Sequence, residues 1–275
     1  MSSSRLKNLA IAALLLLNAF FLTMIILDNA AIAREQRKTM ENICAILRSN
    51  GISVSPADIN SAGELRTMRM TRSDEAEAVI AGVFLDEYIL IDQGGIYLYE
   101  NTARGVAEFA SAGDFEVVLN HGVITDEEGT HRVVRELLSS LGIETSNPVI
   151  TEDGEHRTVT AVCTYRGTEI FNCAIEFVFG SDGSLQTVNG RYMAGADAVE
   201  GGRQISSAAT ALLDFLASVI DGEIECTQIY SVDPGYQRRV VGAFGESELA
   251  PVWLLTTDTG SYIIDDATGQ VAVWN

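Results

Sequence analysis

The chain has 275 residues, of which 47% are hydrophobic and 20% are charged. This mixture is typical of a globular protein with a substantial core, and it is not that of a disordered chain. The formal net charge is −20. Such an acidic protein repels phosphate backbones and anionic lipid headgroups, so we expect no nucleic-acid partner.

The first prominent feature is an apolar segment near the N-terminus. It runs over residues 9–27, 19 residues without a charge, and its only polar members are Asn18 and Thr23. At about 1.5 Å per helical residue, it nearly covers the ~30 Å hydrocarbon core of a bilayer. A cleavable signal peptide has a shorter core of roughly 7 to 15 residues, followed closely by its cleavage site. The sequence therefore favours a transmembrane helix over 9–27, rather than a signal peptide removed near Ala31 and Ala33.

The charges that flank this segment predict its orientation. Arg5 and Lys7 lie directly before the apolar residues, whereas Asp28 begins the other flank. This arrangement is typical of an uncleaved signal anchor with a cytoplasmic N-terminus. We therefore expect a short cytoplasmic tail over 1–8, a single-pass helix in the cell membrane, and an extracytoplasmic remainder.

The next segments predict a helix followed by strands. Met40, Ile43 and Leu47 recur at helical spacing up to Gly51, so this helix could continue upward from the membrane as a stalk. The stretch EYILIDQGGIYLYE, over 87–100, has alternating apolar residues around a glycine turn and predicts a β-hairpin. We assign residues 28–125 to a membrane-proximal α+β domain.

The pattern then restarts twice. Thr125 and Glu128 form a capping-box sequence, which predicts a helix that ends at Gly142 and precedes a three-stranded meander. A second amphipathic helix, capped near Ser206, precedes the last strands. Residues 126–275 are therefore predicted to form a C-terminal α+β domain of two helix-plus-antiparallel-meander units.

No sequence motif indicates catalysis. The chain lacks G-x-S-x-G, the phosphate-binding P-loop and a G-x-G-x-x-G behind a strand. His121, His131 and His156 lie in or beside predicted turns, without the i, i+4 pair of a helical zinc site. We therefore expect no enzyme activity, no metal site and no cofactor.

The four cysteines lack the C-x-x-C spacing of zinc ribbons and redox dithiols. A three-residue loop over 167–169 would place Cys163 and Cys173 opposite each other on a hairpin, where a disulfide is geometrically credible. Both also lie on apolar faces of alternating strands, which favours buried free thiols.

Two stretches resemble YycI-type regulatory proteins. LKNLAIAALLLLNAFFL is similar to the anchor of that family, in which a basic tail leads into an apolar helix with Leu17 and Asn18 followed by Phe20 and Phe21. LAPVWLLTTDTGSYIIDDATGQVAVW resembles the terminal meander of the family and, more generally, PepSY-like units. The resemblance implies a non-enzymatic, single-pass regulator of a two-component system, outside a Gram-positive cytoplasmic membrane.

The same resemblance implies the partners. They are a YycH-like companion protein and the cell-wall sensor histidine kinase YycG, also called WalK. Within the anchor, the Asn18 amide could donate an interhelical hydrogen bond worth roughly 0.5 to 2 kcal/mol, with Phe20 and Phe21 beside it. The other interpretation of Asn18 is a single tolerated polar residue.

A second class of function stays open. The chain could be a tethered PepSY-like module that binds or inhibits a secreted protease or a peptide through its sheet edges. In that case any anchor would serve, whereas a regulator that signals through its helix needs its own anchor.

Overall fold

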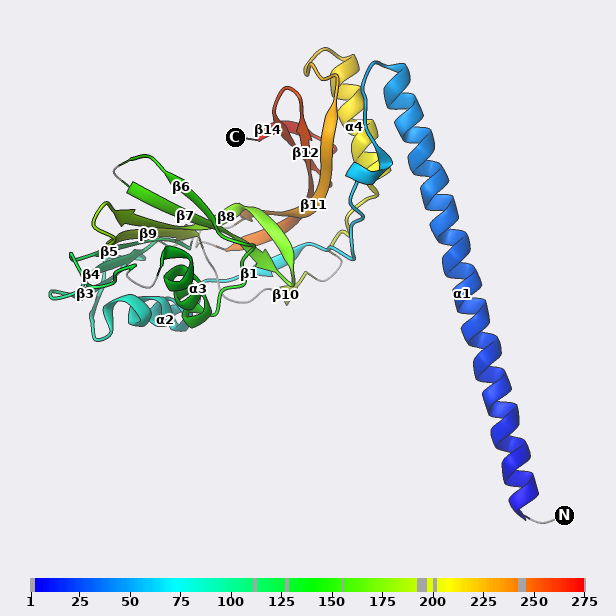
Figure 1. Cartoon of the computed structure of the whole chain (residues 1–275), viewed down its shortest axis with the longest axis horizontal. Helices are drawn as coiled ribbons and strands as arrows, with labels where there is room; N and C mark the ends of the chain where they lie inside the picture. The colour runs from blue at the N-terminus through cyan, green and yellow to red at the C-terminus, as the bar shows by residue number, and fades with distance from the viewer. Residues whose placement is uncertain are drawn as a thin grey trace.

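The computed structural model describes residues 3–110, 113–126, 129–154, 156–191, 197–199, 202–241 and 246–274. Within these ranges, the side chains of 3–13, 15–16, 19, 25–26, 28–33 and 197–198 lie outside the description. Figure 1 shows one long helix that projects from a sheet-rich body.

Groups of strands separate the helices along the described chain. The helices are α1 (Ser3–Ser49), the short 3-10 helix η1 (Pro56–Asp58), α2 (Asp74–Leu85), α3 (Thr130–Leu141) and α4 (Ala208–Ile220). The strands before α3 are β1 (Met68–Met70), β2 (Ile89–Asp92), β3 (Tyr97–Asn101), β4 (Gly105–Phe109) and β5 (Asp114–Leu119). Those between α3 and α4 are β6 (Val149–Glu152), β7 (His156–Tyr165), β8 (Thr168–Gly180), β9 (Leu185–Arg191) and β10 (Asp197–Ala198). The last four are β11 (Ile229–Val240), β12 (Ser247–Thr257), β13 (Ser261–Asp265) and β14 (Val271–Trp274). The predicted α+β class is confirmed.

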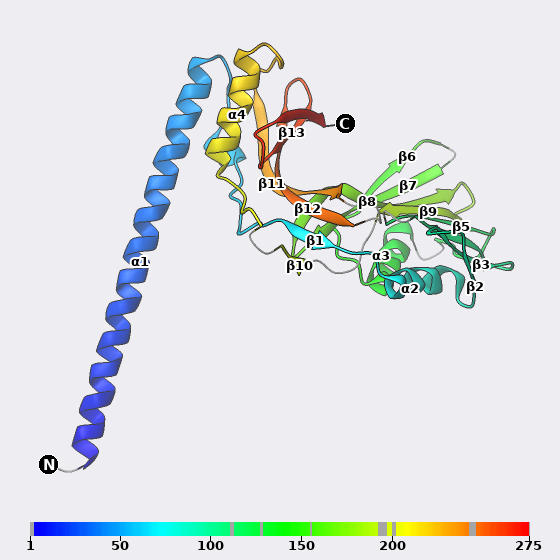
Figure 2. The same ribbon diagram turned by 180° about the vertical axis from the view of Figure 1, so that it is seen from behind.

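The strands form a single connected sheet. Its main order is β10-β1-β12-β11-β8-β9-β5-β4-β3-β2, with β13 and β14 added beyond β12, and β7 and β6 beyond β8. The pairing is antiparallel except where β11 meets β8 in a parallel bridge between Tyr236 and Ile170. This bridge joins two halves of the sheet, which Figures 1 and 2 show at an angle to each other. The first half contains β2–β9, and the second half contains β1 and β10–β14.

Helices cover each half on one side. In the first half, α2 contacts β3, β4 and β5, and α3 packs against α2. In the second half, α4 contacts β13 and β14, and the end of α1 packs against α4. The core of the first half includes the ring series Tyr99, Phe109 and Phe115, whose successive centroids lie 5.3 and 5.6 Å apart.

The helix α1 is packed only at its C-terminal end, as far as its side chains are described. Ile43, Cys44 and Leu47 are buried there, as their helical spacing predicts. Farther toward the N-terminus, the described large apolar side chains are 47–62% exposed; they are Leu14, Leu17, Phe20, Phe21, Leu22, Met24 and Leu27. The predicted helices over 9–27 and up to Gly51 thus form one continuous helix.

Within the described part of the chain, no helix has the length and apolar character to cross a membrane. The predicted span over 9–27 includes side chains that lie outside the description. Its transmembrane character therefore stays a prediction.

The predicted capping box at Thr125 is wrong. The helix α3 begins at Thr130, and its N-cap, Gly129, makes no side-chain cap; Glu128 lies outside the described residues. Thr125 instead forms an isolated antiparallel bridge with Ser184. The start of α3 is held by the Asp126 carboxylate instead, which accepts a hydrogen bond from Thr130 Oγ1 (2.7 Å). The same carboxylate accepts a hydrogen bond from Arg157 Nη1 (2.6 Å) in β7.

Candidate cavity at the base of the long helix

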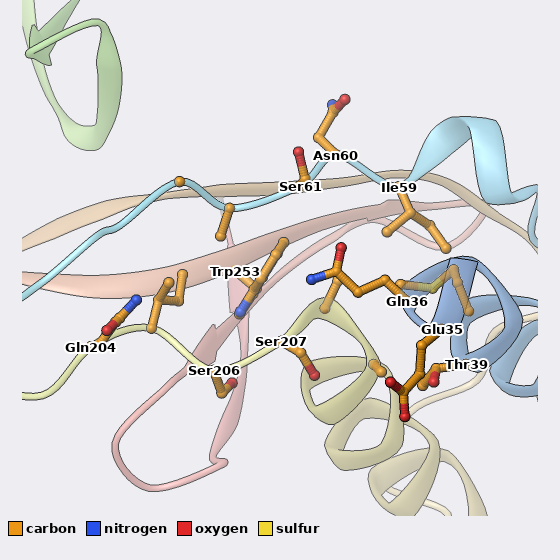
Figure 3. A pocket seen from close by; sticks show the side chains of 16 residues that line it. Glu35, Gln36, Thr39, Ile59, Asn60, Ser61, Gln204, Ser206, Ser207 and Trp253 are labelled. Carbon is orange, nitrogen blue, oxygen red and sulfur yellow. The ribbon is translucent and has the colours of Figure 1, made fainter. Parts of the chain in front are cut away.

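A cavity of about 550 Å³ lies where α1 meets the body of the protein. Its walls come from α1, from the loop over 59–63, from the segment over 204–209 that leads into α4, and from β12. Figure 3 shows these side chains from close by. The volume lies within the range of about 300–1,000 Å³ typical of small-molecule sites.

One helical face of α1 supplies the first wall. Glu35, Gln36, Thr39 and Met40 line the cavity, because residues three and four apart share one side of a helix. The next turns carry the buried residues Ile43 and Leu47, which fix the end of α1 against the core. The wall of the cavity and the packed end of α1 therefore belong to one rigid element.

The start of α4 supplies the opposite wall. Ser207 is its N-cap and accepts a hydrogen bond from the Thr210 N–H (3.3 Å). The Ser206 N–H donates to the buried carboxylate of Asp266 (2.7 Å), so this entry segment is held in place. The first N–H groups of a helix lack intrahelical acceptors and carry partial positive charge. This wall therefore favours an acceptor group in the cavity.

Trp253 of β12 forms the floor. Its side chain is 1% exposed, and its indole Nε1 has no hydrogen-bond partner among the described residues. An unpaired buried donor costs about 1–3 kcal/mol. Figure 3 shows this nitrogen on the side of Ser206 and Ser207, with the Gln36 amide reaching toward the ring.

The lining defines the chemistry that the cavity can perform. Amide, hydroxyl and carboxylate groups lie around the indole floor of Trp253, which suits a small polar ligand that can both donate and accept hydrogen bonds. The described residues contain no cluster of three or more His, Cys, Asp or Glu side chains that could hold a metal ion. These lining groups define the cavity as the candidate site of this chain.

The predicted contact residues of the anchor lie elsewhere on α1. Asn18, Phe20 and Phe21 are exposed, and the two phenyl rings lie 5.9 Å apart. Asn18 precedes Gln36 by 18 residues, or roughly 27 Å along a helix. The structure therefore places the predicted partner contact and the cavity on one helix but far apart.

Cys163 and Cys173 are free thiols, each 3% exposed. The predicted three-residue loop between them is wrong, because Arg166 and Gly167, both with positive φ, form a two-residue turn and Tyr165 pairs with Thr168.

The register between β7 and β8 then shifts between Val162 and Thr164. Cys163 and Cys173 both line a second, smaller cavity. Burial raises the pKa of Cys163 to about 12 and that of Cys173 to about 11. Both groups are therefore protonated thiols at neutral pH.

No family model and no curated protein matches the chain. Among solved structures, an uncharacterized protein from Eubacterium rectale ATCC 33656 is similar, with a TM-score of 0.50 and 10% identity over 81% of this chain and 93% of that one. The Bacillus megaterium YpeB C-terminal domain matches at a TM-score of 0.35 and 13% identity, over 75% of this chain and 100% of that domain. The first similarity shows a shared fold and nothing about function, and the second is too weak to carry an argument. The resemblance to YycI-type proteins stays a prediction.

Sequence patterns did not reveal the first cavity. Its walls come from four segments, and neither Gln36 nor Ser207 belongs to a motif. Trp253 belongs to the stretch LAPVWLLTTDTGSYIIDDATGQVAVW, whose pattern predicts a meander and no cavity. A tryptophan in an otherwise apolar strand is a weak signal of a buried donor, since its N–H usually needs a partner.

Proposed function

We propose that this chain is a membrane-anchored, non-catalytic regulator whose long helix couples the membrane to the extracytoplasmic body. One observation carries the proposal: α1 runs without interruption from the apolar segment to residues that line the cavity and pack in the core. A rotation or shift of the helix in the membrane that loosens the packing of Ile43 and Leu47 would therefore move Gln36 and Met40 relative to Trp253. Conversely, a ligand in the cavity would favour one position of α1.

The membrane anchor itself is part of the proposal. The segment over 9–27 carries no charge, and its described large apolar side chains are exposed. Seven large exposed apolar side chains on one helix call for a covering partner, which a bilayer or an apolar helix would supply. We place the N-terminus in the cytoplasm and the body outside.

We further propose a sensor histidine kinase of the YycG (WalK) type as the partner, together with a YycH-like companion protein. This part rests on the resemblance of the two terminal stretches. We propose that contact between transmembrane helices within the bilayer carries the regulation.

Insertions in α1 test the proposal. Two alanines added within 28–33 rotate the two ends of the helix by about 200° relative to each other, whereas seven residues restore the phase to within about 20°. If α1 transmits a signal, the two-residue insertion abolishes the effect on kinase autophosphorylation in membranes that contain both proteins, and the seven-residue insertion retains much of it. Equal membrane levels of the variants are the control. Identical behaviour of both insertions and wild type would contradict a coupling role.

The tethered-module alternative is favoured by a different observation, at the edge of the sheet. β2 pairs only with β3 among the described strands, and Ile89, Leu90 and Ile91 on it are 70%, 51% and 39% exposed. An exposed apolar edge strand can accept an extended peptide as an additional strand. A Leu90→Lys substitution should abolish such peptide binding without affecting kinase regulation, so the two functions can be separated.

A further inference from the structure

Arg238 in β11 is a buried guanidinium without a carboxylate partner in the described part of the chain. Its side chain is 6% exposed; Nε donates to Ser247 Oγ (3.1 Å), and Nη2 is buried with no hydrogen-bond partner among the described residues. Its neighbour Arg239 forms an ion pair with Asp265 (2.6 Å), and the half-buried Arg72 forms one with Glu77 (2.6 Å). A buried cation without a counterion costs several kcal/mol. Arg238 therefore lacks the kind of partner that Arg72 and Arg239 have.

Arg238 lies on the wall of the second cavity, of about 210 Å³. Arg166 and Arg191 line the same cavity, together with the carboxylate-bearing Glu144. Arg191 is already paired with Asp114. Three arginines against the two carboxylates of Glu144 and Asp114 leave one excess positive charge, in a chain whose net charge is −20.

The remaining walls are mostly apolar. They include Met70, Ile143 and Ile170, together with the thiols of Cys163 and Cys173. Because those thiols stay protonated, they add no negative charge that could satisfy Arg238. Burial also lowers the pKa of the Arg238 guanidinium, although the Cys173 thiol and the Asp114 carboxylate act in the opposite direction.

We propose that this second cavity binds a small carboxylate, with the guanidinium of Arg238 as its principal hydrogen-bond donor. A single excess positive charge matches a monoanion, and a guanidinium fits the planar carboxylate group. The apolar walls would contact a short alkyl group. A phosphate dianion fits less well, because its second charge would face Glu144. This site goes beyond the proposed regulatory function and does not depend on it.

The test uses the purified full-length chain and acetate as the probe. Sodium acetate is titrated by calorimetry and thermal unfolding, against sodium chloride at equal ionic strength. We expect saturable heat and a rise in Tm with acetate alone. Arg238→Met should weaken acetate binding by at least about tenfold and raise the Tm of the acetate-free protein, because it removes an unpaired buried charge. Arg132→Met, which alters a largely exposed arginine on α3, should bind acetate like wild type.

A second variant covers the case in which Arg238→Met fails to fold. Arg238→Lys keeps the charge but loses the planar fork, so its affinity for acetate should fall about fivefold or more. Equal responses to acetate and chloride in wild type would overturn the proposal. Unchanged acetate binding in the folded Arg238 variants would also overturn it, and tighter binding of phosphate than of acetate would overturn the assignment of a carboxylate.

Discussion

Gly235 in β11 lies against the aromatic ring of Phe171 in β8, at the junction of the two halves of the sheet. A Cβ added at Gly235 would overlap the ring and approach the Glu169 carbonyl oxygen to 2.9 Å. The missing side chain therefore lets β11 come close enough for Tyr236 to bridge Ile170.

Substitution of this glycine should loosen the junction. Gly235→Ala forces either the Phe171 ring or the backbone of β8 to move, and overpacking of this kind costs about 1–3 kcal/mol. We expect the free energy of unfolding to fall by that amount in urea denaturation.

Gly82 in α2 provides the matched control. It is a helical glycine with nothing within 4 Å of an added Cβ. Gly82→Ala should therefore stabilise the protein by about 0.5–1 kcal/mol through helix propensity. Equal effects of the two substitutions would show that contact with Phe171 does not constrain position 235.

Arg72 is expected to be a principal stabilising residue of the first half. Its guanidinium donates to both Glu77 carboxylate oxygens (2.6 and 2.9 Å) and to the carbonyl of Gly95 (2.5 Å), and lies 4.2 Å from the centre of the Tyr97 ring. Arg72→Met leaves Glu77, 6% exposed, without this counterion. We expect a loss of about 3 kcal/mol.

The exposed pair of Arg132 and Glu136 on α3 is the comparison for this loss. The two side chains are 63% and 61% exposed, so Arg132→Met should cost no more than about 0.5 kcal/mol. Similar losses at positions 72 and 132 would contradict the role assigned to burial.

Local patterns in the sequence predicted the local structure well. The hairpin of β2 and β3 and the end of α3 at Gly142 follow from alternation and from glycine signals within a few residues. The join between β11 and β8 could not be predicted in this way. It depends on the contact between Gly235 and the Phe171 ring, which are 64 residues apart in sequence. Local periodicity in the sequence cannot indicate such a contact.

The sites show the same limit more strongly. Among the described residues, Trp253 Nε1 lacks an acceptor and Arg238 lacks a carboxylate, and both are properties of the packed interior. Strand alternation places Cys163 and Cys173 on the correct hairpin, but it indicates neither the two-residue turn nor the register shift between Val162 and Thr164.

The two buried thiols should make the protein sensitive to alkali. Their folded pKa values, about 12 for Cys163 and about 11 for Cys173, lie above the ordinary value of 9.0. Groups with raised pKa contribute stability that is fully present below pH 9 and is lost as the pH rises through the folded values. We expect a loss of a few kcal/mol between pH 9 and 12, because a one-unit difference between the folded and unfolded pKa of a group corresponds to about 1.4 kcal/mol.

Urea unfolding of Cys163→Ala at several pH values tests this contribution. The variant should lose less stability between pH 9 and 12 than wild type does. Cys44→Ala, at the base of α1, should change that slope less, because desolvation raises the Cys44 pKa while the nearby Arg48 charge lowers it. A pH slope in Cys163→Ala as steep as in wild type would mean that other groups cause the alkaline loss.

The last prediction concerns Asn18, which is exposed on the uncovered part of α1. If an interhelical hydrogen bond in the bilayer contributes to kinase association, Asn18→Leu should leave the membrane level of the protein unchanged and weaken that association by up to ~2 kcal/mol. Asn18→Gln keeps the amide and should restore much of the association. Co-purification of the kinase with each variant, at matched membrane levels, measures the effect. If the kinase is recovered with Asn18→Leu as efficiently as with wild type, Asn18 is only a tolerated polar residue and does not contribute to the association. Equal recovery with an unrelated spanning helix in place of 9–27 would favour the tethered module, because any anchor holds such a module equally well.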